Sequence, residues 1–360
     1  MIPRKVSVLG VETEQCAMVD KVERPVEPSD AMESCALSAP RIPTLDGWRG
    51  VAILLVLFDH TESILWGRYL HPTGLHGVTI FFVLSGFLIT SNLLQGPVDL
   101  RKFYVRRFFR LMPVAWIYFL TLFVIGWSTN VRTTSSSAVL ACLFFYRNFV
   151  TPPFGITTVH FWSLSLEEQF YIVLPCLLVF AGVRSCRSIV AAGIIGVAVY
   201  RLMTWAHCNP LSSFVRADAL LTGTLMAMFL QNPQIRSRAI QWSKWWAFPA
   251  LALLIYCVAR FTLLPPLIEC VSIALLLTAS IFHSKAFAAR PLSTWVLSKL
   301  GIISYSIYVW HGIFVVLARA GGLKSFLFLG ICLPLFAIES YLLIERPCNR
   351  IGHRLTRVSS

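Results

Sequence analysis

The sequence predicts an all-α fold, a polytopic bundle of about ten helices that span a membrane. Two observations lead to this fold class. Of the 360 residues, 56% are hydrophobic and only 13% are charged, about half the charged share of a soluble domain. The hydrophobic residues also stand in runs of about 20, the length that crosses a bilayer as a helix. A soluble protein of this size cannot bury so much apolar surface.

The polar ends of the chain differ from this apolar middle. Residues 1–44 carry mixed charges and several prolines, among them Pro25, Pro28, Pro40 and Pro43, and no apolar run of a signal peptide follows the early basic residues. We interpret 1–44 as a disordered polar cytoplasmic tail. Residues 45–348 form the predicted membrane domain, and 349–360 form a basic cytoplasmic tail.

Apolar runs within the membrane domain define the predicted spans. We place them at 48–66, 76–95, 112–128, 162–182, 188–206, 215–231, 246–262, 267–283, 298–318 and 323–344. Segment 138–150 is also apolar, but it is short and contains Arg147. With this segment not crossing and both termini cytoplasmic, the inner connections and the C-terminal segment from Arg346 onward together hold more than twice as many basic residues as the outer connections. That asymmetry follows the positive-inside rule. We therefore expect ten crossings, with 138–150 re-entrant or interfacial.

Composition also limits the class of function. The net charge of +14 would suggest nucleic acid in a soluble protein, but here the basic residues stand mostly between apolar runs. That placement favours membrane topology and anionic lipids over nucleic acid. The ten cysteines include no CxxC pair and no zinc or haem spacing, so we expect no metal site. The chain lacks the matching broken helices of many transporters.

Ionisable residues inside apolar spans are costly and need a reason. In the span 48–66, Arg49 lies at the cytoplasmic end and His60 follows eleven residues later. Eleven residues return to nearly the same helix face with a rise of roughly 16 Å. This spacing suits a cationic anchor at the inner mouth and a base beyond the bilayer middle. The alternative is a snorkelling arginine and a histidine that only joins two helices.

A second cationic pair opens the span 112–128. Arg107 and Arg110 are three residues apart, so they are neighbours on one helix face. A guanidinium group suits phosphate oxygens. Ordinary positive-inside charge is the alternative interpretation.

A group of polar residues lies toward the outer side of the predicted bundle. Six of them can converge there: His60, His160, Glu167, Arg216, Asp218 and His311. A base, a carboxylate and cations in one cavity suit removal of a hydroxyl proton and stabilisation of an oxyanion. Because Glu167 and Glu168 are adjacent on a helix, we expect only one of them to face the cavity, and the family resemblance described below implies that it is Glu167. The alternative is a structural hydrogen-bond network between helices.

These residues occur in motifs that resemble the acyltransferase 3 family of membrane acyltransferases, which includes bacterial O-acetyltransferases of surface and signal glycans. The resemblance covers residues 41 to 348. It rests on six motifs in order: LDGWRG followed by His60, FFVLSGFLIT at 81–90, RRFFRLMP at 106–113, HFWSLSLEEQFY at 160–171, RADALLTG at 216–223 and SYSIYVWH at 304–311.

The resemblance implies a reaction and roles for residues. The family moves an acyl group, usually acetyl, from acyl-coenzyme A to a hydroxyl of an acceptor, commonly a sugar. It implies that His60 acts as base or transient acyl carrier, with Glu167 beside it in the catalytic set. Arg49, Arg107 and Arg110 would bind the coenzyme A phosphates. The acceptor would contact His160, Ser163, Arg216, Asp218 and His311.

The expected partners are therefore acetyl-CoA or another acyl-CoA, a glycan or glycolipid acceptor and membrane lipids, in the cell inner membrane. The acceptor stays open among surface polysaccharide, a lipochitooligosaccharide and a macrolide-type molecule. An alternative function is a proton-coupled transporter or exporter of a polar solute, with a relay through His60, Glu167 and His311. The other large class of membrane O-acyltransferases also uses an intramembrane histidine, but its Asn-containing signature is not evident.

Overall fold

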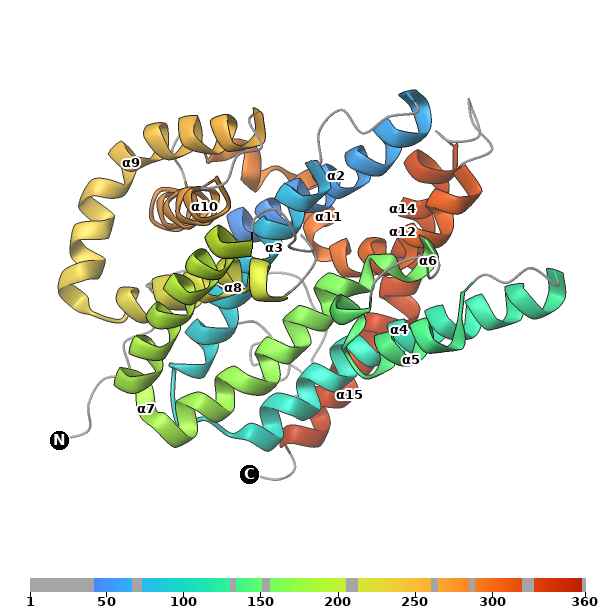
Figure 1. Cartoon of the computed structure of the whole chain (residues 1–360), viewed down its shortest axis with the longest axis horizontal. Helices are drawn as coiled ribbons and strands as arrows, with labels where there is room; N and C mark the ends of the chain where they lie inside the picture. The colour runs from blue at the N-terminus through green and yellow to red at the C-terminus, as the bar shows by residue number, and fades with distance from the viewer. Residues whose placement is uncertain are drawn as a thin grey trace, which may run out of the picture.

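The computed structural model describes residues 42–66, 73–129, 134–150, 156–204, 213–259, 265–284, 289–318 and 327–357 (Figure 1). Every regular element within these ranges is a helix, which confirms the predicted all-α class for the described part of the chain. Residues 1–41 of the predicted N-terminal tail lie outside these ranges.

The helices overlap the predicted apolar runs. In chain order they are α2 (Pro43–Trp66), α3 (Thr73–Leu93), α4 (Leu100–Thr129), α5 (Ser136–Leu143), η1 (Arg147–Phe149), α6 (Ile156–Val159), α7 (Phe161–Thr204), α8 (Ser213–Leu230), α9 (Pro233–Ala259), α10 (Pro265–Phe282), η2 (Arg290–Ser293), α11 (Trp295–Ile302), α12 (Ser304–Ala318), η3 (Leu327–Cys332), α14 (Leu333–Ser340), η4 (Tyr341–Glu345) and α15 (Arg346–Arg357). Of these, η3 and η4 are π-helical. The helices α4 and α9 begin well before the runs 112–128 and 246–262, and the run 298–318 divides between α11 and α12.

Length and apolar composition qualify four stretches of the described chain as membrane spans. They are Thr73–Leu93, Leu100–Thr129, Thr157–Thr204 and Leu327–Arg357. The pair α11 and α12, bent by 72°, would add a fifth as one broken span. These helices show a multi-pass membrane protein. The predicted ten crossings and the cytoplasmic placement of both termini stay predictions.

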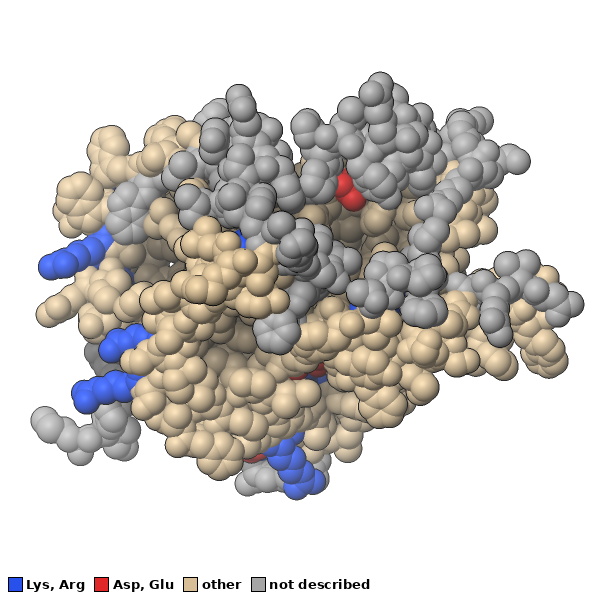
Figure 2. Space-filling model, in the orientation of Figure 1, with Lys and Arg blue, Asp and Glu red and all other residues tan. Residues whose placement is uncertain are grey.

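The outer surface of α4 shows how the bundle meets lipid. Trp116, Leu120, Phe123 and Trp127 recur at helical spacing and are 51%, 60%, 67% and 78% exposed. An apolar stripe of this kind covers one face of a helix, and a soluble monomer rarely exposes so large a patch. Figure 2 shows the same property over the face it draws, where a broad tan surface with only small patches of red and blue separates the blue side chains at the left and lower edges. We assign the stripe to the lipid-facing side.

Segment 138–150 forms two short pieces, α5 and η1, that pack against α7. Gln169 of α7 donates to the carbonyl of Phe145 over 2.5 Å and to Asn148 Oδ1 over 3.0 Å. The eight residues of α5 extend about 12 Å, well short of a bilayer core of about 30 Å. The segment therefore does not cross as one helix, and its re-entrant or interfacial position stays a prediction.

Glycines bring α3 and α8 into close contact (Figure 1). A Cβ atom on Gly86 would lie 2.0 Å from the carbonyl oxygen of Leu220, and one on Gly223 would lie 2.0 Å from that of Val83. Small residues permit such approach between membrane helices. The packing fixes α3, which carries Ser85, against the centre of the bundle.

The helix α7 is two helices in sequence. Gly182 has φ of 72° and ψ of 166°, a left-handed conformation that glycine adopts without a Cβ penalty. The break falls at the end of the predicted span 162–182. The first half of α7 carries Ser163, Glu167 and Tyr171 toward the interior.

Two contacts outside the apolar part position α4 and α15. The backbone N–H of Lys102 donates to Asp99 Oδ1 over 2.9 Å, which lowers the pKa of Asp99 below its ordinary value and caps the start of α4. At the other end of the chain, Arg106 Nε donates to Thr356 Oγ1 over 2.9 Å. The predicted tail 349–360 is therefore helical through Arg357 and docked on α4.

Candidate active site

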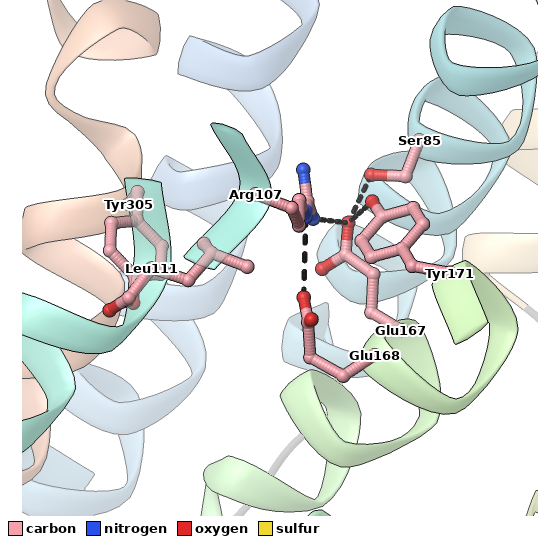
Figure 3. A network of polar contacts seen from close by, with 7 residues as sticks. All are labelled: Ser85, Arg107, Leu111, Glu167, Glu168, Tyr171 and Tyr305. Carbon is pink, nitrogen blue, oxygen red and sulfur yellow. Dashed lines mark hydrogen bonds and ion pairs between the residues drawn. The ribbon is translucent and has the colours of Figure 1, made fainter. Parts of the chain in front are cut away.

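A buried ionic network joins α4 to α7 (Figure 3). Arg107 lies 3.5 Å from Glu167 Oε1 through Nη2 and 3.3 Å from Glu168 Oε1 through Nε. All three side chains are at most 19% exposed. A buried charge needs such pairing because removal from water is costly.

Two hydroxyl groups complete this network. Ser85 of α3 and Tyr171 of α7 both donate to Glu167 Oε1 (Figure 3). The Arg107 guanidinium also stacks over the Tyr171 ring, 3.6 Å from its centroid, a favourable cation–π arrangement. Three helices thus hold Glu167 in one position.

The network forms part of the wall of a cavity of about 190 Å³, which we call the narrow chamber. Its polar lining includes Arg49, Ser85, Arg107, Arg110, Ser163, Glu167, Tyr305 and Tyr308. The three arginines predicted as one donor-binding group therefore share a single cavity. Arg49 is further oriented by Asp46, whose carboxylate lies 2.8 Å from its Nη1.

A wider cavity of about 550 Å³, the wide chamber, adjoins the narrow one. The two share Arg49, Leu88, Asn92, Arg110, Ser304 and Tyr305 in their walls. Arg110 exposes much of its side chain, and both chambers include it in their lining. The two chambers therefore form one passage. Arg49 and Arg110 line the junction between them, which we call the waist.

Three histidines from three parts of the chain cluster beyond the narrow chamber. The ring centroids of His60 and His311 are 5.1 Å apart, and those of His160 and His311 are 4.5 Å apart. His60 is half-buried, whereas His160 and His311 are buried. The structure thus brings together the three histidines expected on the outer side of the bundle.

Backbone carbonyls fix the tautomers of two of these rings. His160 Nε2 lies 3.1 Å from the carbonyl oxygen of Val309, and His311 Nδ1 lies 2.6 Å from that of Tyr308. Since a carbonyl only accepts, each of these nitrogens carries the proton of a neutral ring. The lone pair of His311 is then on Nε2, and that of His160 is on Nδ1. Both rings can accept a proton or hydrogen bond from a neighbour.

Tyr308 stands between the narrow chamber and the histidines. It lines the chamber, and its hydroxyl lies 2.5 Å from Ser163 Oγ and donates to the carbonyl of His160 over 2.9 Å. Its ring centroid is 5.3 Å from that of His311. Ser163 and Tyr308 therefore connect the end of the passage to the histidine cluster.

Gly312 packs closely against one side of the histidine cluster. A Cβ atom at this position would lie 2.5 Å from His160 Cε1 and 2.8 Å from the Tyr118 hydroxyl. Tyr118 itself donates to the carbonyl of Thr157 over 2.5 Å. Even an alanine at position 312 must displace the His160 ring.

Arg216 and Asp218 lie in a different ionic cluster from the histidines. Asp218 Oδ2 pairs with Arg201 Nη2 at 2.7 Å, and Glu269 is the other acidic neighbour of Arg216. Glu269 also lies 2.9 Å from His76 Nδ1. Arg201 of α7 and Glu269 of α10 are thus the ionic neighbours of Asp218 and Arg216, and the expected convergence of Arg216 and Asp218 with His60 stays a prediction.

Glu167 also has different neighbours from those expected. It was assigned with the outer histidines, but it contacts Arg107, which belongs to the inner arginine group. Glu167 lines the narrow chamber and Glu168 does not, as expected for adjacent residues. The two carboxylates do, however, share a partner. Both carboxylates reach Arg107, since its long side chain extends between adjacent positions of α7.

Sequence reasoning did not single out Ser85, Tyr171 or Tyr308. Tyr171 is four residues after Glu167 and Tyr308 is three before His311, so helical spacing places each beside a predicted residue. Their positions in the quoted motifs were an available signal. Ser85 also lies in a quoted motif, FFVLSGFLIT, but its approach to Glu167 depends on the packing of α3, which helical spacing does not predict.

Comparison with known proteins decides the family. The profile described as an acyltransferase domain, of the acyltransferase 3 type, matches residues 42–344. The chain belongs to the acyltransferase 3 family. No solved structure matches it. Among the described residues, no group of three His, Cys, Asp or Glu side chains is arranged to hold a metal ion.

Curated relatives of this acyltransferase 3 chain are bacterial. A Staphylococcus aureus (strain COL) protein named as an O-acetyltransferase is 29% identical over 86% of this chain and 58% of its own length. A Bacillus subtilis (strain 168) protein named as a peptidoglycan O-acetyltransferase is 30% identical over 87% and 56%. The Listeria monocytogenes peptidoglycan O-acetyltransferase OatA is 25% identical over 75% and 49%. The chain thus spans about half the length of these relatives.

Proposed function

We propose that this protein is an O-acetyltransferase of the cell inner membrane that moves an acetyl group from cytoplasmic acetyl-CoA to a hydroxyl of a glycan or glycolipid. One observation carries the proposal. A passage lined by arginines at its waist ends at Ser163 and Tyr308, directly beside three clustered histidines. Family membership and the names of the relatives support the same chemistry.

The shape and charge of the passage suit acyl-coenzyme A. This donor has a bulky, phosphorylated nucleotide end and a slender uncharged arm that ends in a thioester. Arg49 and Arg110, which line both chambers, supply guanidinium groups, and guanidinium groups bind phosphate oxygens well. Arg107 adds positive charge deeper in the narrow chamber, where it is paired with Glu167 and Glu168. The arm would extend past Glu167 toward Tyr308. Under the ten-span topology proposed from the charge distribution, this direction runs from the cytoplasm outward.

His60 is the proposed base. A nitrogen of His60 takes the proton of the acceptor hydroxyl while its oxygen attacks the thioester carbonyl carbon. The tetrahedral intermediate then expels the coenzyme A thiolate, which recovers the proton. The products are an acetyl ester and the free thiol, so atoms and charge balance. In the alternative, a nitrogen of His60 attacks the thioester and releases the coenzyme A thiol, and the acceptor hydroxyl then takes the acetyl group from His60, breaking the N–acyl bond and returning the proton balance to the free enzyme.

The neighbours of His60 have supporting roles in this proposal. His311 has its Nδ1 proton directed to a carbonyl, so Nε2 is available to accept a hydrogen bond from the acceptor or from His60. Ser163 and His160 complete the acceptor side. Glu167 positions Arg107 and contacts the donor arm. We assign Arg216 and Asp218 no step in the transfer, because they have ionic neighbours of their own.

The acceptor class follows from the relatives. Two of them are named for peptidoglycan, and the third for O-acetyltransferase activity alone. We therefore propose a carbohydrate hydroxyl at the outer side of the membrane as the acceptor.

Mass spectrometry of surface glycans and glycolipids from cells with and without the gene tests this function. We expect one class of glycan to gain the mass of one acetyl group only when the gene is present. Uptake assays with membrane vesicles provide the competing outcome. Accumulation of a polar solute without consumption of acetyl-CoA would instead indicate a transporter.

A further inference from the structure

The helix α15 forms one wall of the wide chamber. Arg346, Asn349, Arg350 and His353 line it together with Arg49 and Arg110 of the waist. From sequence, Arg346 and Arg350 count only as basic charge of the cytoplasmic C-terminal segment. In Figure 1 α15 lies at the lower end of the molecule, and Figure 2 shows basic side chains emerging at that edge.

The charges of the wide chamber are unevenly compensated. Its two acidic residues already have partners, because Asp46 pairs with Arg49 at 2.8 Å and Glu345 accepts from Ser306 Oγ over 2.9 Å. Arg346 and Arg350 make no ion pair within the described residues. They are four apart, so they lie on one face of α15. Two guanidinium groups thus border the same cavity without an anionic partner from the described chain.

The wall that α15 provides is docked on the bundle. Thr356 accepts from Arg106 Nε over 2.9 Å. A Cβ atom on Gly352 would lie 2.9 Å from Cβ of Phe109, so α15 and α4 pack closely. The positions of Arg346 and Arg350 are therefore set by contacts of other residues, as a preorganised binding site requires.

We propose that the wide chamber binds the phosphorylated nucleotide end of the acyl donor, with Arg346 and Arg350 as its phosphate ligands. The inference rests on the proposed function in one respect, namely that the donor is acyl-coenzyme A. The volumes of the two chambers match the bulky nucleotide end and the slender arm of the donor. The chamber of about 550 Å³ takes the nucleotide, and the one of about 190 Å³ takes the slender arm. The ligand chemistry is a phosphate monoester and a diphosphate.

Substitution of Arg350 by glutamine tests the site in the full-length purified protein. Arg354→Gln is the matched control, since it removes the same charge from an exposed position of the same helix and Arg354 does not line the chamber. We expect Arg350→Gln to raise KM for acetyl-CoA about 10- to 100-fold, the range for loss of one charge-assisted contact. The value of kcat stays unchanged, because the lost contact is present in ground and transition states alike.

Acetyl-pantetheine, which lacks all the phosphates, gives the second readout. Its KM should be the same for wild type, Arg350→Gln and Arg354→Gln. Equal effects of Arg350→Gln on both donors, or equal effects of the two variants on acetyl-CoA, would overturn the inference. Calorimetric titration of CoA into the purified protein measures donor binding without acetyl transfer. It therefore distinguishes a failure of the nucleotide site from a failure of the proposed function. A wild-type chain that binds CoA more tightly than Arg350→Gln but transfers no acetyl group contradicts the function alone.

A lipid headgroup offers the same phosphate chemistry, so the lipid environment is varied. The kinetics are repeated in vesicles of phosphatidylcholine alone and in vesicles that also contain phosphatidylglycerol. The proposal predicts the same rise in KM in both. A defect of Arg350→Gln that occurs only with phosphatidylglycerol would assign the chamber to an anionic lipid and overturn the inference.

Discussion

His60→Ala is expected to abolish acetyl transfer while the protein still inserts and folds. His60 is half-buried beside His311, with ring centroids 5.1 Å apart, and it is the proposed acceptor of the hydroxyl proton. Loss of a positioned general base lowers a rate about 10²- to 10⁴-fold. Acetyl transfer from acetyl-CoA by purified wild type and variant measures the effect, with gel filtration in detergent as the check on folding.

Two further variants separate loss of chemistry from loss of structure. His60→Gln keeps a polar side chain of similar length and should be as inactive as His60→Ala. Gly312→Ala should also reduce kcat, because its Cβ atom would meet His160 Cε1 at 2.5 Å. Gly196→Ala is the matched control, since a Cβ atom there meets nothing within 4 Å. Wild-type turnover by folded His60→Ala would remove His60 from the mechanism.

Arg107→Met is expected to destabilise the protein as well as inactivate it. Arg107 is the partner of two carboxylates, at 3.5 Å from Glu167 and 3.3 Å from Glu168, and none of the three side chains is more than 19% exposed. Removal of one partner of a buried ion pair costs about 3–5 kcal/mol. We expect a lower thermal unfolding midpoint in detergent and no measurable acetyl transfer.

A compensating change distinguishes the ion pairs from simple loss of packing. In the double variant Arg107→Met with Glu168→Gln, one buried carboxylate no longer needs a cation. This double variant should recover part of the stability but none of the activity, since donor binding still lacks Arg107. Arg101→Met, at an exposed position of the same helix, is the control for charge. A midpoint of Arg107→Met equal to wild type contradicts the account of the network.

Local patterns predicted the elements of this protein well, because a helix in lipid must be apolar over a fixed length. The run 162–182 and residues 188–204 of the next run lie in α7, and the break at Gly182 falls at the end of the first run. Segment 138–150 was recognised as too short to cross, and α5 has only eight residues. The number of crossings is a property of the bilayer as well as of the helices, and it stays a prediction.

Side-chain partners across helices were less predictable. Arg49, Arg107 and Arg110 share one cavity, as expected from their position at one end of their helices. Depth along a span, however, does not determine which helix is the neighbour. Arg216 and Asp218 have the same expected depth as the histidines, yet their ionic neighbours are Arg201 and Glu269.

Charges in the C-terminal segment show a second limit of sequence reasoning. Arg346 and Arg350 satisfied the positive-inside rule, so nothing in the pattern demanded a further role. Their place in a chamber wall depends on the docking of α15 through Arg106 and Thr356, a contact between residues 250 positions apart. Such contacts follow from the assembled bundle and leave no local signature.

The most direct test of the central claim is acetyl transfer in sealed membrane vesicles of known orientation. Acetyl-CoA does not cross the bilayer, so it can be supplied to one face at a time while the glycan acceptor is present. We predict acetylated acceptor only when acetyl-CoA reaches the cytoplasmic face, with one free thiol released for each acetyl group transferred. Equal transfer from the outer face would contradict a donor passage that begins in the cytoplasm and ends at His60.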